Sequence, residues 1–402
     1  MENFSKVLSI TYGDYPKDWQ FEQLGNIGYT YSGLRGKSKD DFIKGNCPYI
    51  PFTNIMSNVV INNDNFEFVQ VSKFESQNLA LKEDLFFNGS SETPEEVGMC
   101  SVLLNDVPNL YLNSFCFGFR FYTKSIVFPL FLVYFFRSSI GRKILFPLAQ
   151  GYTRYNLSKS AFLDLFIPIP PFPEQRAIAE VLSDVDALIE AQEALIEKKR
   201  LIKQGMMQEL LTGKRQLSGF SGDWVTIQVK DVFDLKRGQV LATSKIMDAP
   251  IGDYKYPVYS SQTQNNGLLG FYDDHLFEDC ITWTTDGANA GDVNFRSGKF
   301  YCTNVCGVCI NNSDYSNKCI AGIINRVSRE YVSYVGNPKL MNNVFAEITV
   351  NIPSSVDDQK EISKVIDDFD KEINLLELKL GKLKLIKQGM MQELLTGRTR
   401  LV

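Results

Sequence analysis

Several patterns on which enzymes depend are absent from this chain of 402 residues. Its single histidine, His275, excludes histidine-rich metal sites and has no serine or cysteine elbow to activate. The Asp/Asn-Pro-Pro-aromatic loop of methyltransferases that act on amino groups is missing, because Lys339 follows the one Asn-Pro pair. Gly36-Lys37-Ser38 is not a phosphate-binding loop, because Tyr31 stands where that loop needs a glycine. We therefore predict a protein without catalytic residues.

A strongly basic balance is absent as well. The net charge is −5, and residues 1–167 carry 15 basic and 16 acidic side chains, while residues 214–351 carry 13 and 14. This balance argues against a free-standing, strongly basic nucleic-acid binder. Any contact with nucleic acid would have to use local basic patches.

Runs long enough to span a membrane are also missing. The most apolar stretch, Ile126–Phe136, has eleven residues, whereas a transmembrane helix needs about 20. We interpret it as a buried helix in a domain core and expect no membrane association. The first residues show no basic region followed by an apolar one, so we expect no signal peptide, reduced thiols and a cytoplasmic protein.

The spacing of the cysteines argues against a metal site. Four of the eight cysteines lie between positions 302 and 319, but they lack the two paired knuckles of a zinc site. The segment Thr303–Ile310 alternates and is rich in β-forming residues, which favours small apolar side chains in buried strands. We therefore expect no bound metal.

What the sequence does contain is a long internal repeat. The segment LIKQGMMQELLTG occurs at Leu201–Gly213 and again, 184 positions later, at Leu385–Gly397. With the same offset, residues 174–213 align with residues 358–397 without a gap. A proline-containing, strand-like piece precedes each copy, FIPIPPFPEQ or VNIPSSVDDQ. The prolines end the strands, and Ser354 or Ser355 can cap the second of two helices.

Both copies show a helical pattern with a narrow apolar seam. Each helix should be about 40 residues, or roughly 60 Å, long, and should end at Gly213 or Gly397. A narrow stripe on a long helix needs a partner, so we predict that the two helices pack against each other as an antiparallel coiled coil. The predicted seam residues are Leu182, Val185, Ile189, Ile196, Ile366, Phe369, Ile373, Leu376, Leu380 and Leu383.

The segments between the helices repeat more faintly. Trp19 lies 14 positions before Gly33, and Trp224 lies 14 positions before Gly238, within similar stretches that begin with Asp-Trp. We predict an α+β protein with pseudo-two-fold symmetry, in which two mixed α/β domains are separated by the two helices. The predicted division is domain 1 at residues 1–167, helix 1 at 168–213, domain 2 at 214–351 and helix 2 at 352–402.

This order of parts resembles the specificity (S) subunit of type I restriction–modification systems over essentially the whole chain. The stretches that carry the resemblance are the Asp-Trp start of each domain, GKSKDDFIKGNCPYIPFTNI, KYPVYSSQTQNNGLLGFYDD, the run GYTRYNLSKSAFLDLFIPIPPFPEQRAIAEVLSDVDALI and the LIKQGMMQELLTG endings. The second helix entry departs from the family pattern, because it reads SSVDDQ where the first reads PPFPEQ.

The resemblance implies a non-catalytic subunit that gives a complex its DNA sequence specificity. Each target-recognition domain would read one half of a bipartite, asymmetric double-stranded target, and the helices would set the gap. The implied partners are two methyltransferase (M) subunits and the restriction/translocase (R) subunits of a host-defence system. Those partners would methylate adenine N6 and cleave DNA, and they would bind S-adenosylmethionine, ATP and Mg; this chain would need no cofactor. The alternative is a coiled-coil scaffold whose domains bind proteins or glycans.

Candidate DNA-binding residues come from basic clusters and from turn-like segments that offer forked or amide side chains. Each such segment is also compatible with an ordinary solvated loop. One basic run, Arg137 to Lys159, contains no acidic residue, and Arg154 in its Gly-Tyr-Thr-Arg loop is the foremost candidate. The predicted set is Arg35, Lys37, Lys39, Ser90, Arg142, Lys143, Tyr152, Arg154, Arg237, Lys245, Gln262, Gln264 and Asn265.

Overall fold

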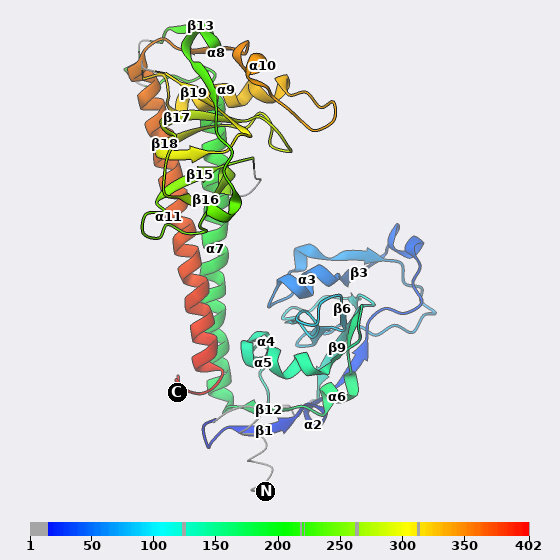
Figure 1. Cartoon of the computed structure of the whole chain (residues 1–402). Helices are drawn as coiled ribbons and strands as arrows, with labels where there is room; N and C mark the ends of the chain where they lie inside the picture. Colours follow the sequence, from blue (N-terminus) through cyan, green and yellow to red (C-terminus); the bar gives the residue numbers. More distant parts are fainter. Residues whose placement is uncertain are drawn as a thin grey trace. The chain divides into compact units, whose positions relative to one another are not determined.

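The computed structural model describes residues 15–122, 126–217, 219–220, 222–261, 265–311 and 314–401. It divides into two compact units (Figure 1). Unit 1 comprises residues 1–192 and 379–402, and unit 2 comprises residues 193–378. Both units combine sheets with helices, and each contains one end of both long helices, α7 (Phe172–Leu210) and α11 (Val356–Leu394). The predicted α+β class is confirmed.

Unit 1 contains a four-stranded sheet of order β2-β9-β5-β7. A second sheet has the order β4-β3-β8, and β1 pairs with β12 at the entry to α7. The strands are β1 (Gln20–Gln23), β2 (Gly28–Ser32), β3 (Cys47–Ile50), β4 (Glu67–Val69), β5 (Leu85–Asn88), β6 (Ser90–Ser91), β7 (Cys100–Val102), β8 (Tyr111–Leu112), β9 (Cys116–Phe121), β10 (Ala149–Gln150), β11 (Tyr155–Leu157) and β12 (Phe166–Ile169).

Besides α7 and α11, unit 1 contains shorter helices. Those that precede α7 are α2 (Leu24–Ile27), η1 (Lys39–Phe42), α3 (Phe52–Ser57), η2 (Asn63–Asn65), α4 (Pro129–Arg137), α5 (Ser139–Leu145), η3 (Phe146–Leu148) and α6 (Lys159–Leu163). The apolar run singled out in the sequence forms α4, with proline in its first turn and every residue from Pro129 to Phe136 buried. This helix belongs to the core of unit 1, as predicted.

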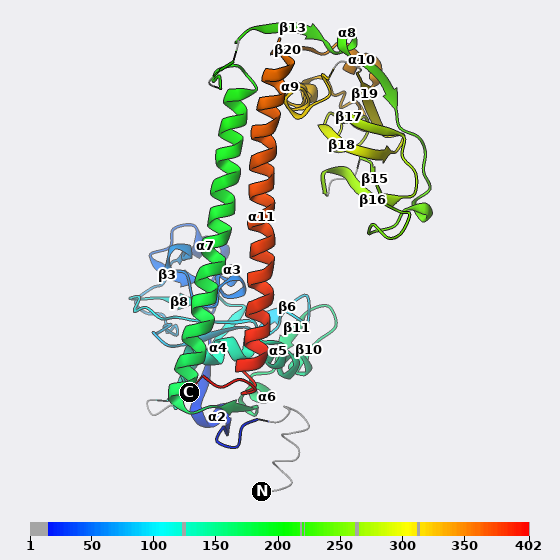
Figure 2. The same cartoon turned by 90° about the vertical axis from the view of Figure 1, so that its left-hand side faces the viewer.

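Unit 2 has one six-stranded sheet, β14-β19-β17-β18-β15-β16, whose first four strands repeat the order of β2-β9-β5-β7, and β13 pairs with β20 at the entry to α11. Its strands are β13 (Trp224–Gln228), β14 (Asp234–Arg237), β15 (Tyr256–Tyr259), β16 (Leu268–Tyr272), β17 (Phe277–Thr284), β18 (Val293–Cys302), β19 (Cys306–Ile310) and β20 (Thr349–Pro353). Its shorter helices are α8 (Val229–Val232), η4 (Thr243–Lys245), η5 (Asn265–Gly267), α9 (Lys318–Ser328), η6 (Arg329–Tyr331) and α10 (Asn342–Ala346). Figure 2 shows α9 beside α11.

The cysteines of unit 2 fill apolar space. Cys302 lies in β18, Cys306 and Cys309 lie in β19, and all three are buried, as the alternating pattern predicted. Cys319 is buried in α9 instead. Burial raises the pKa of the Cys306 thiol to about 11, so this thiol stays protonated and unreactive at neutral pH.

Within each unit, α7 and α11 run antiparallel and bury the predicted seam (Figures 1 and 2). All ten predicted seam residues are buried or half-buried, whereas Leu188 and Leu375, which lie off the seam, are 57% and 67% exposed. Gln192 and Lys199 occupy seam positions of α7, where Gln192 is buried and Lys199 forms an ion pair with Glu372 of α11. Polar residues in the first copy are therefore accommodated without breaking the helix pair.

An ion pair in each unit follows the 184-residue repeat. In unit 1, Lys387 of α11 pairs with Asp186 of α7. In unit 2 the lysine is on α7 and the aspartate on α11, the reverse of unit 1, because Lys203 of α7 pairs with Asp370 of α11. Asp186 also accepts a hydrogen bond of 2.8 Å from the Tyr134 hydroxyl, while Asp370 accepts one of 3.0 Å from Lys318.

The glycine that follows each long helix lies beside a tryptophan ring. Gly213 and Gly397 have φ of 72° and 70°, the left-handed conformation that favours glycine after a helix. A Cβ at Gly213 would lie 2.9 Å from the Trp224 ring, and one at Gly397 would lie 3.2 Å from the Trp19 ring. The repeated glycines and tryptophans of the sequence therefore meet in space. In unit 1, Trp19 Nε1 also donates to Glu174, which Arg400 contacts from the C-terminal segment.

Candidate nucleic-acid interface

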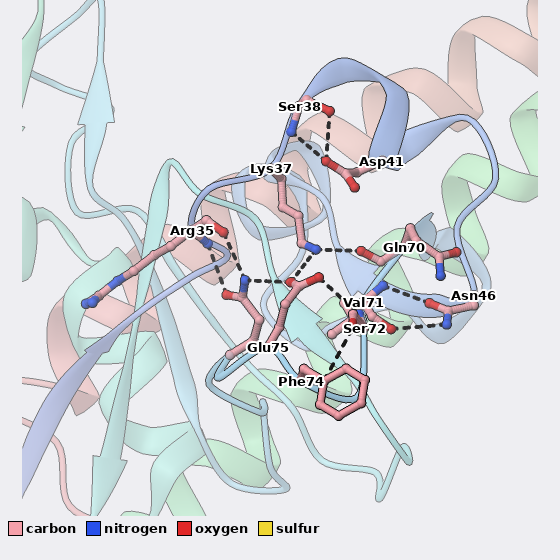
Figure 3. Close-up of polar contacts among 11 residues, drawn as sticks. Arg35, Lys37, Ser38, Asp41, Asn46, Gln70, Val71, Ser72, Phe74 and Glu75 are labelled. Carbon is pink, nitrogen blue, oxygen red and sulfur yellow. Dashed lines mark hydrogen bonds and ion pairs between the residues drawn. The ribbon is translucent and has the colours of Figure 1, made fainter.

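The segment after β2 is held rigid by a polar network (Figure 3). Lys37 Nζ donates to the carbonyl of Gln70 at 2.6 Å and pairs with Glu75, and the Lys37 side chain is only 6% exposed. The hydrogen bond from Lys37, followed by those from Ser72 and Gln77, lowers the pKa of Glu75 to about 2. Lys37 therefore fastens this segment, and its predicted contact with DNA stays a prediction.

The backbone of Arg35 is fixed by the same network. Gln77 Oε1 accepts from the Arg35 amide at 3.1 Å, and Gln77 Nε2 donates to the Arg35 carbonyl at 2.9 Å. Ser38 and Asp41 close a capping box at the start of η1, where Lys39 is exposed. The Arg35 side chain is exposed and points away from the other labelled residues in Figure 3.

Arg35 and Lys159 converge on one hydroxyl group. Arg35 Nη2 donates to Ser32 Oγ at 2.6 Å, and Lys159 Nζ donates to the same oxygen at 3.4 Å. Lys159 Nζ also lies 5.4 Å from the centre of the Phe117 ring. Burial, and then the nearby positive charge of Arg35, lowers the pKa of Lys159. The chain thus gathers two cations from positions more than a hundred residues apart.

A hollow of about 360 Å³ in unit 1 brings together Arg154 and Ser90, two of the predicted residues. Strand β6 with Ser90 pairs with β11, which directly follows Arg154. The Arg154 guanidinium lies 5.6 Å from the centre of the Phe115 ring, which also lines the hollow. Tyr152, in the same loop as Arg154, is 98% exposed. Glu92 and Glu96 also line the hollow, so this arrangement of an arginine, an aromatic ring and a small polar residue suits contact with bases rather than with phosphates.

The basic run from Arg137 to Lys159 divides into two groups. Arg137 donates to the carbonyls of Cys100 and Met56 at 2.9 and 2.8 Å, and Arg142 donates to that of Glu95 at 2.7 Å. These two arginines hold loops of their own domain in place, and burial lowers the pKa of both. Lys143, in contrast, is exposed on α5.

In unit 2 the predicted residues are more scattered. Arg237 Nε donates to Asn342 Oδ1 at 3.1 Å, so its side chain links β14 to α10. Lys245 is exposed on η4, and Asn265 is exposed at the start of η5. Gln262 and Gln264 lie outside the described residues.

Sequence reasoning missed Arg296 on β18. Its guanidinium lies 3.9 Å from the centre of the Tyr259 ring, and it donates to the Asn266 carbonyl at 2.8 Å and to Thr282 Oγ1 at 3.1 Å. It lines a polar cleft of about 240 Å³ that also contains Asn294. Because two of its nitrogens already donate within the domain, the stacked guanidinium is fixed in position at this cleft. The only signal in the sequence was an arginine within a strand-like segment.

Known proteins match nearly the whole length of this chain. Residues 16–198 and 221–385 each match the family model of the type I restriction modification DNA specificity domain. A protein described as the N-terminus of a putative type I specificity subunit of Mycoplasma pneumoniae is 40% identical over 147 residues, which are 36% of this chain and 76% of that protein. Another putative type I specificity subunit of M. pneumoniae is 30% identical over 217 residues, 52% of this chain and 83% of that one.

Solved structures show the same fold. The S subunit of a type I restriction–modification system from M. genitalium has a TM-score of 0.61 at 18% identity, over 95% of this chain and 96% of that chain. A chain from a structure concerning complex assembly and conformational transition of a type I system has a TM-score of 0.57 at 13% identity, over 96% and 100% of the two chains. No helix in the described part of the chain is long and apolar enough to cross a membrane. With both of its halves matched by the family model, the chain belongs to the type I restriction–modification specificity subunits.

Proposed function

We propose that this specificity subunit reads a bipartite, asymmetric double-stranded DNA target, with one half read by residues 1–167 and the other by residues 214–351. The observation that carries the proposal is the repetition of one strand order with different surface residues. Arg35, Lys159 and Arg154 face outward in unit 1, whereas unit 2 offers Arg296 and a cleft rich in asparagine. One topology with two sets of side chains suits the reading of two different sequences.

The two helices suit a spacer and a docking surface. Each has 39 residues, or about 58 Å at ~1.5 Å per residue. Their last turns carry an identical segment, and equivalent surfaces suit two copies of one partner. In this proposal the helices set the gap and dock two M subunits, through which R subunits join. The partners carry S-adenosylmethionine, ATP and Mg and perform adenine-N6 methylation and cleavage in the cytoplasm, and this chain itself binds no cofactor.

The test is to co-express the chain with an M subunit and to sequence genomic DNA with detection of modified adenines. We expect one two-part motif. Replacing residues 16–167 by the corresponding domain of another specificity subunit should change one half of that motif and keep the other. Methylation that ignores sequence, or a swap that changes both halves, would contradict the proposal.

The spacer role has a separate test. Inserting four residues, about one turn, into both α7 and α11 should lengthen the unread gap by roughly 6 Å, or about two base-pair steps. Both half-sites should stay as they were. Altered half-sites with an unaltered gap would show that the helices do not set the spacing.

A further inference from the structure

The meeting point of Arg35, Ser32 and Lys159 in unit 1 is a concentration of positive charge without a compensating acid. None of the ion pairs between described residues includes Arg35 or Lys159, whereas nearby Lys37 is paired with Glu75. Both cationic nitrogens reach the same oxygen atom, so the two like charges are held close together. Such a pair is unfavourable in the free protein and becomes favourable when an anion binds.

The geometry of the hydroxyl group points to the same kind of ligand. Ser32 Oγ accepts a hydrogen bond from each cation, so its own hydrogen is left to be donated. The three groups together therefore present only donors: a guanidinium, an ammonium and a hydroxyl. Phosphate oxygens accept from such sets in charge-assisted hydrogen bonds.

The site is built before any ligand arrives. The Gln77 side chain holds the backbone of Arg35 on both sides, and the Lys37–Glu75 pair fastens the next turn of the chain (Figure 3). The position of Lys159 is restrained by a cation–π contact, because its ammonium lies over the Phe117 ring. A preorganised site loses less conformational freedom on binding than a flexible loop does.

We propose that Ser32, Arg35 and Lys159 form a seat for one DNA phosphate, which positions domain 1 on the duplex without reading a base. This inference rests on the proposed function, since it names the part of the DNA that this site takes. Base reading by domain 1 then belongs to other residues, such as Arg154 beside Phe115.

The experiment uses the full chain assembled with its M subunits and measures the affinity for DNA carrying the methylated motif over a range of KCl concentrations. R35Q, K159Q and the double variant each remove positive charge from the seat. Loss of one phosphate contact lowers the slope of log K against log[salt] by about one, so we expect a change of about one for the double variant and of no more than that for each single variant. The methylated sequence should not change.

The matched control is K82Q, which removes the same charge from the same domain. Lys82 is exposed and lines a different hollow with Arg120, at the opposite end of β9 from Phe117. This variant should keep the wild-type slope. K159R should keep most of the affinity, because it retains the positive charge.

A phosphate-by-phosphate substitution locates the contact. One uncharged methylphosphonate in the half-site of domain 1 should weaken binding by the wild type and have no further effect on the double variant. If the wild type binds its motif while R35Q and K159Q behave like K82Q, the seat is wrong. A changed methylated motif with an unchanged salt slope would also overturn it, since it would mean base reading. If the wild-type assembly shows no sequence preference at all, it is the proposed function that fails.

Discussion

The sheets of the two units share a strand order but are stabilised by different interactions. In unit 1, buried Asp84, directly before β5, accepts hydrogen bonds from the Tyr31 hydroxyl of β2 at 2.6 Å and from Arg120 Nε of β9 at 2.8 Å. In unit 2, Trp283 of β17 stacks on Phe345 with ring centres 4.0 Å apart. The topology therefore does not depend on one core chemistry, which leaves each domain free to diverge.

The apolar stack of unit 2 should give the largest loss of stability. Phe345 is fully buried, so Phe345→Ala removes its contacts and leaves a cavity beside Trp283. We expect a loss of about 3–5 kcal/mol in the free energy of unfolding. Chemical denaturation followed by tryptophan fluorescence measures it. The matched control is Phe74→Ala, because Phe74 is fully exposed, and a similar loss in both variants would contradict this account.

The buried polar cluster around Asp84 in unit 1 should be nearly as sensitive. Asp84→Ala leaves Arg120 and Tyr31 without their shared acceptor. Because the Arg120 side chain is 26% exposed, we expect about 3 kcal/mol, the lower end for a broken buried pair. Thermal unfolding of unit 1 reports the change. Exposed Asp106, changed to alanine, should cost less than about 0.5 kcal/mol, and equality of the two variants would show that the buried pair is unimportant.

The two repeated ion pairs should differ in strength. Asp370→Lys loses two lysine partners, Lys203 and Lys318, whereas Asp186→Lys loses only Lys387 and the Tyr134 hydroxyl. For these half-exposed pairs we expect about 2 kcal/mol for Asp370 and about 1 kcal/mol for Asp186. The double variant Asp186→Lys/Lys387→Asp should recover part of the loss. Equal costs without recovery would argue against a specific pairing of the helices.

The pH dependence of the Asp370 pair follows from its pKa. Burial favours the protonated acid, but the hydrogen bonds from Lys203 and Lys318 outweigh it and keep the pKa below the usual 3.8. A lowered folded-state pKa stabilises the fold above the unfolded value and loses that contribution as the pH falls through the folded value. The stability difference between wild type and Asp370→Asn should therefore shrink below about pH 4. Unfolding curves from pH 7 to 2.5 test this, and a constant difference would contradict it.

The helix-ending glycines should give an effect similar in size to that of the ion pairs. Alanine at either position must adopt a left-handed conformation, which costs about 1–2 kcal/mol. We expect Gly397→Ala to lower the free energy of unfolding more than Gly213→Ala does. The new Cβ at position 397 would lie 2.4 Å from Pro16, whereas the one at position 213 would lie no closer than 2.9 Å to the Trp224 ring. Comparing the two melting temperatures measures the difference. A larger loss for Gly213→Ala would show that Pro16 can move away from the new methyl group more easily than Trp224 can.

The parts of the fold that the sequence predicted are those with local signals. The seam of the helices follows from a spacing of three and four residues, and α4 follows from an apolar run bounded by proline and arginine. The cap by Ser355, which accepts from the Asp358 amide at 3.4 Å, was one of two candidates. The continuous six-stranded sheet of unit 2 had no such signal, because strand pairing joins distant segments.

The candidate interface was predicted less well, because charge in a sequence does not show its partners. Lys37 and Arg142 were indistinguishable from Arg35 and Lys143 until their acceptors, Glu75 and the carbonyl of Glu95, were located. Lys159 was noted only as part of a basic run. Its position beside Arg35 depends on the packing of β2 against β9, which no local pattern encodes.

The reciprocal lysine–aspartate contacts have a consequence for how such chains can vary. Each long helix contributes one aspartate and one lysine, and each receives the complementary group from the other helix. A change at any of these four positions therefore has its compensating partner on the other helix, not on its own.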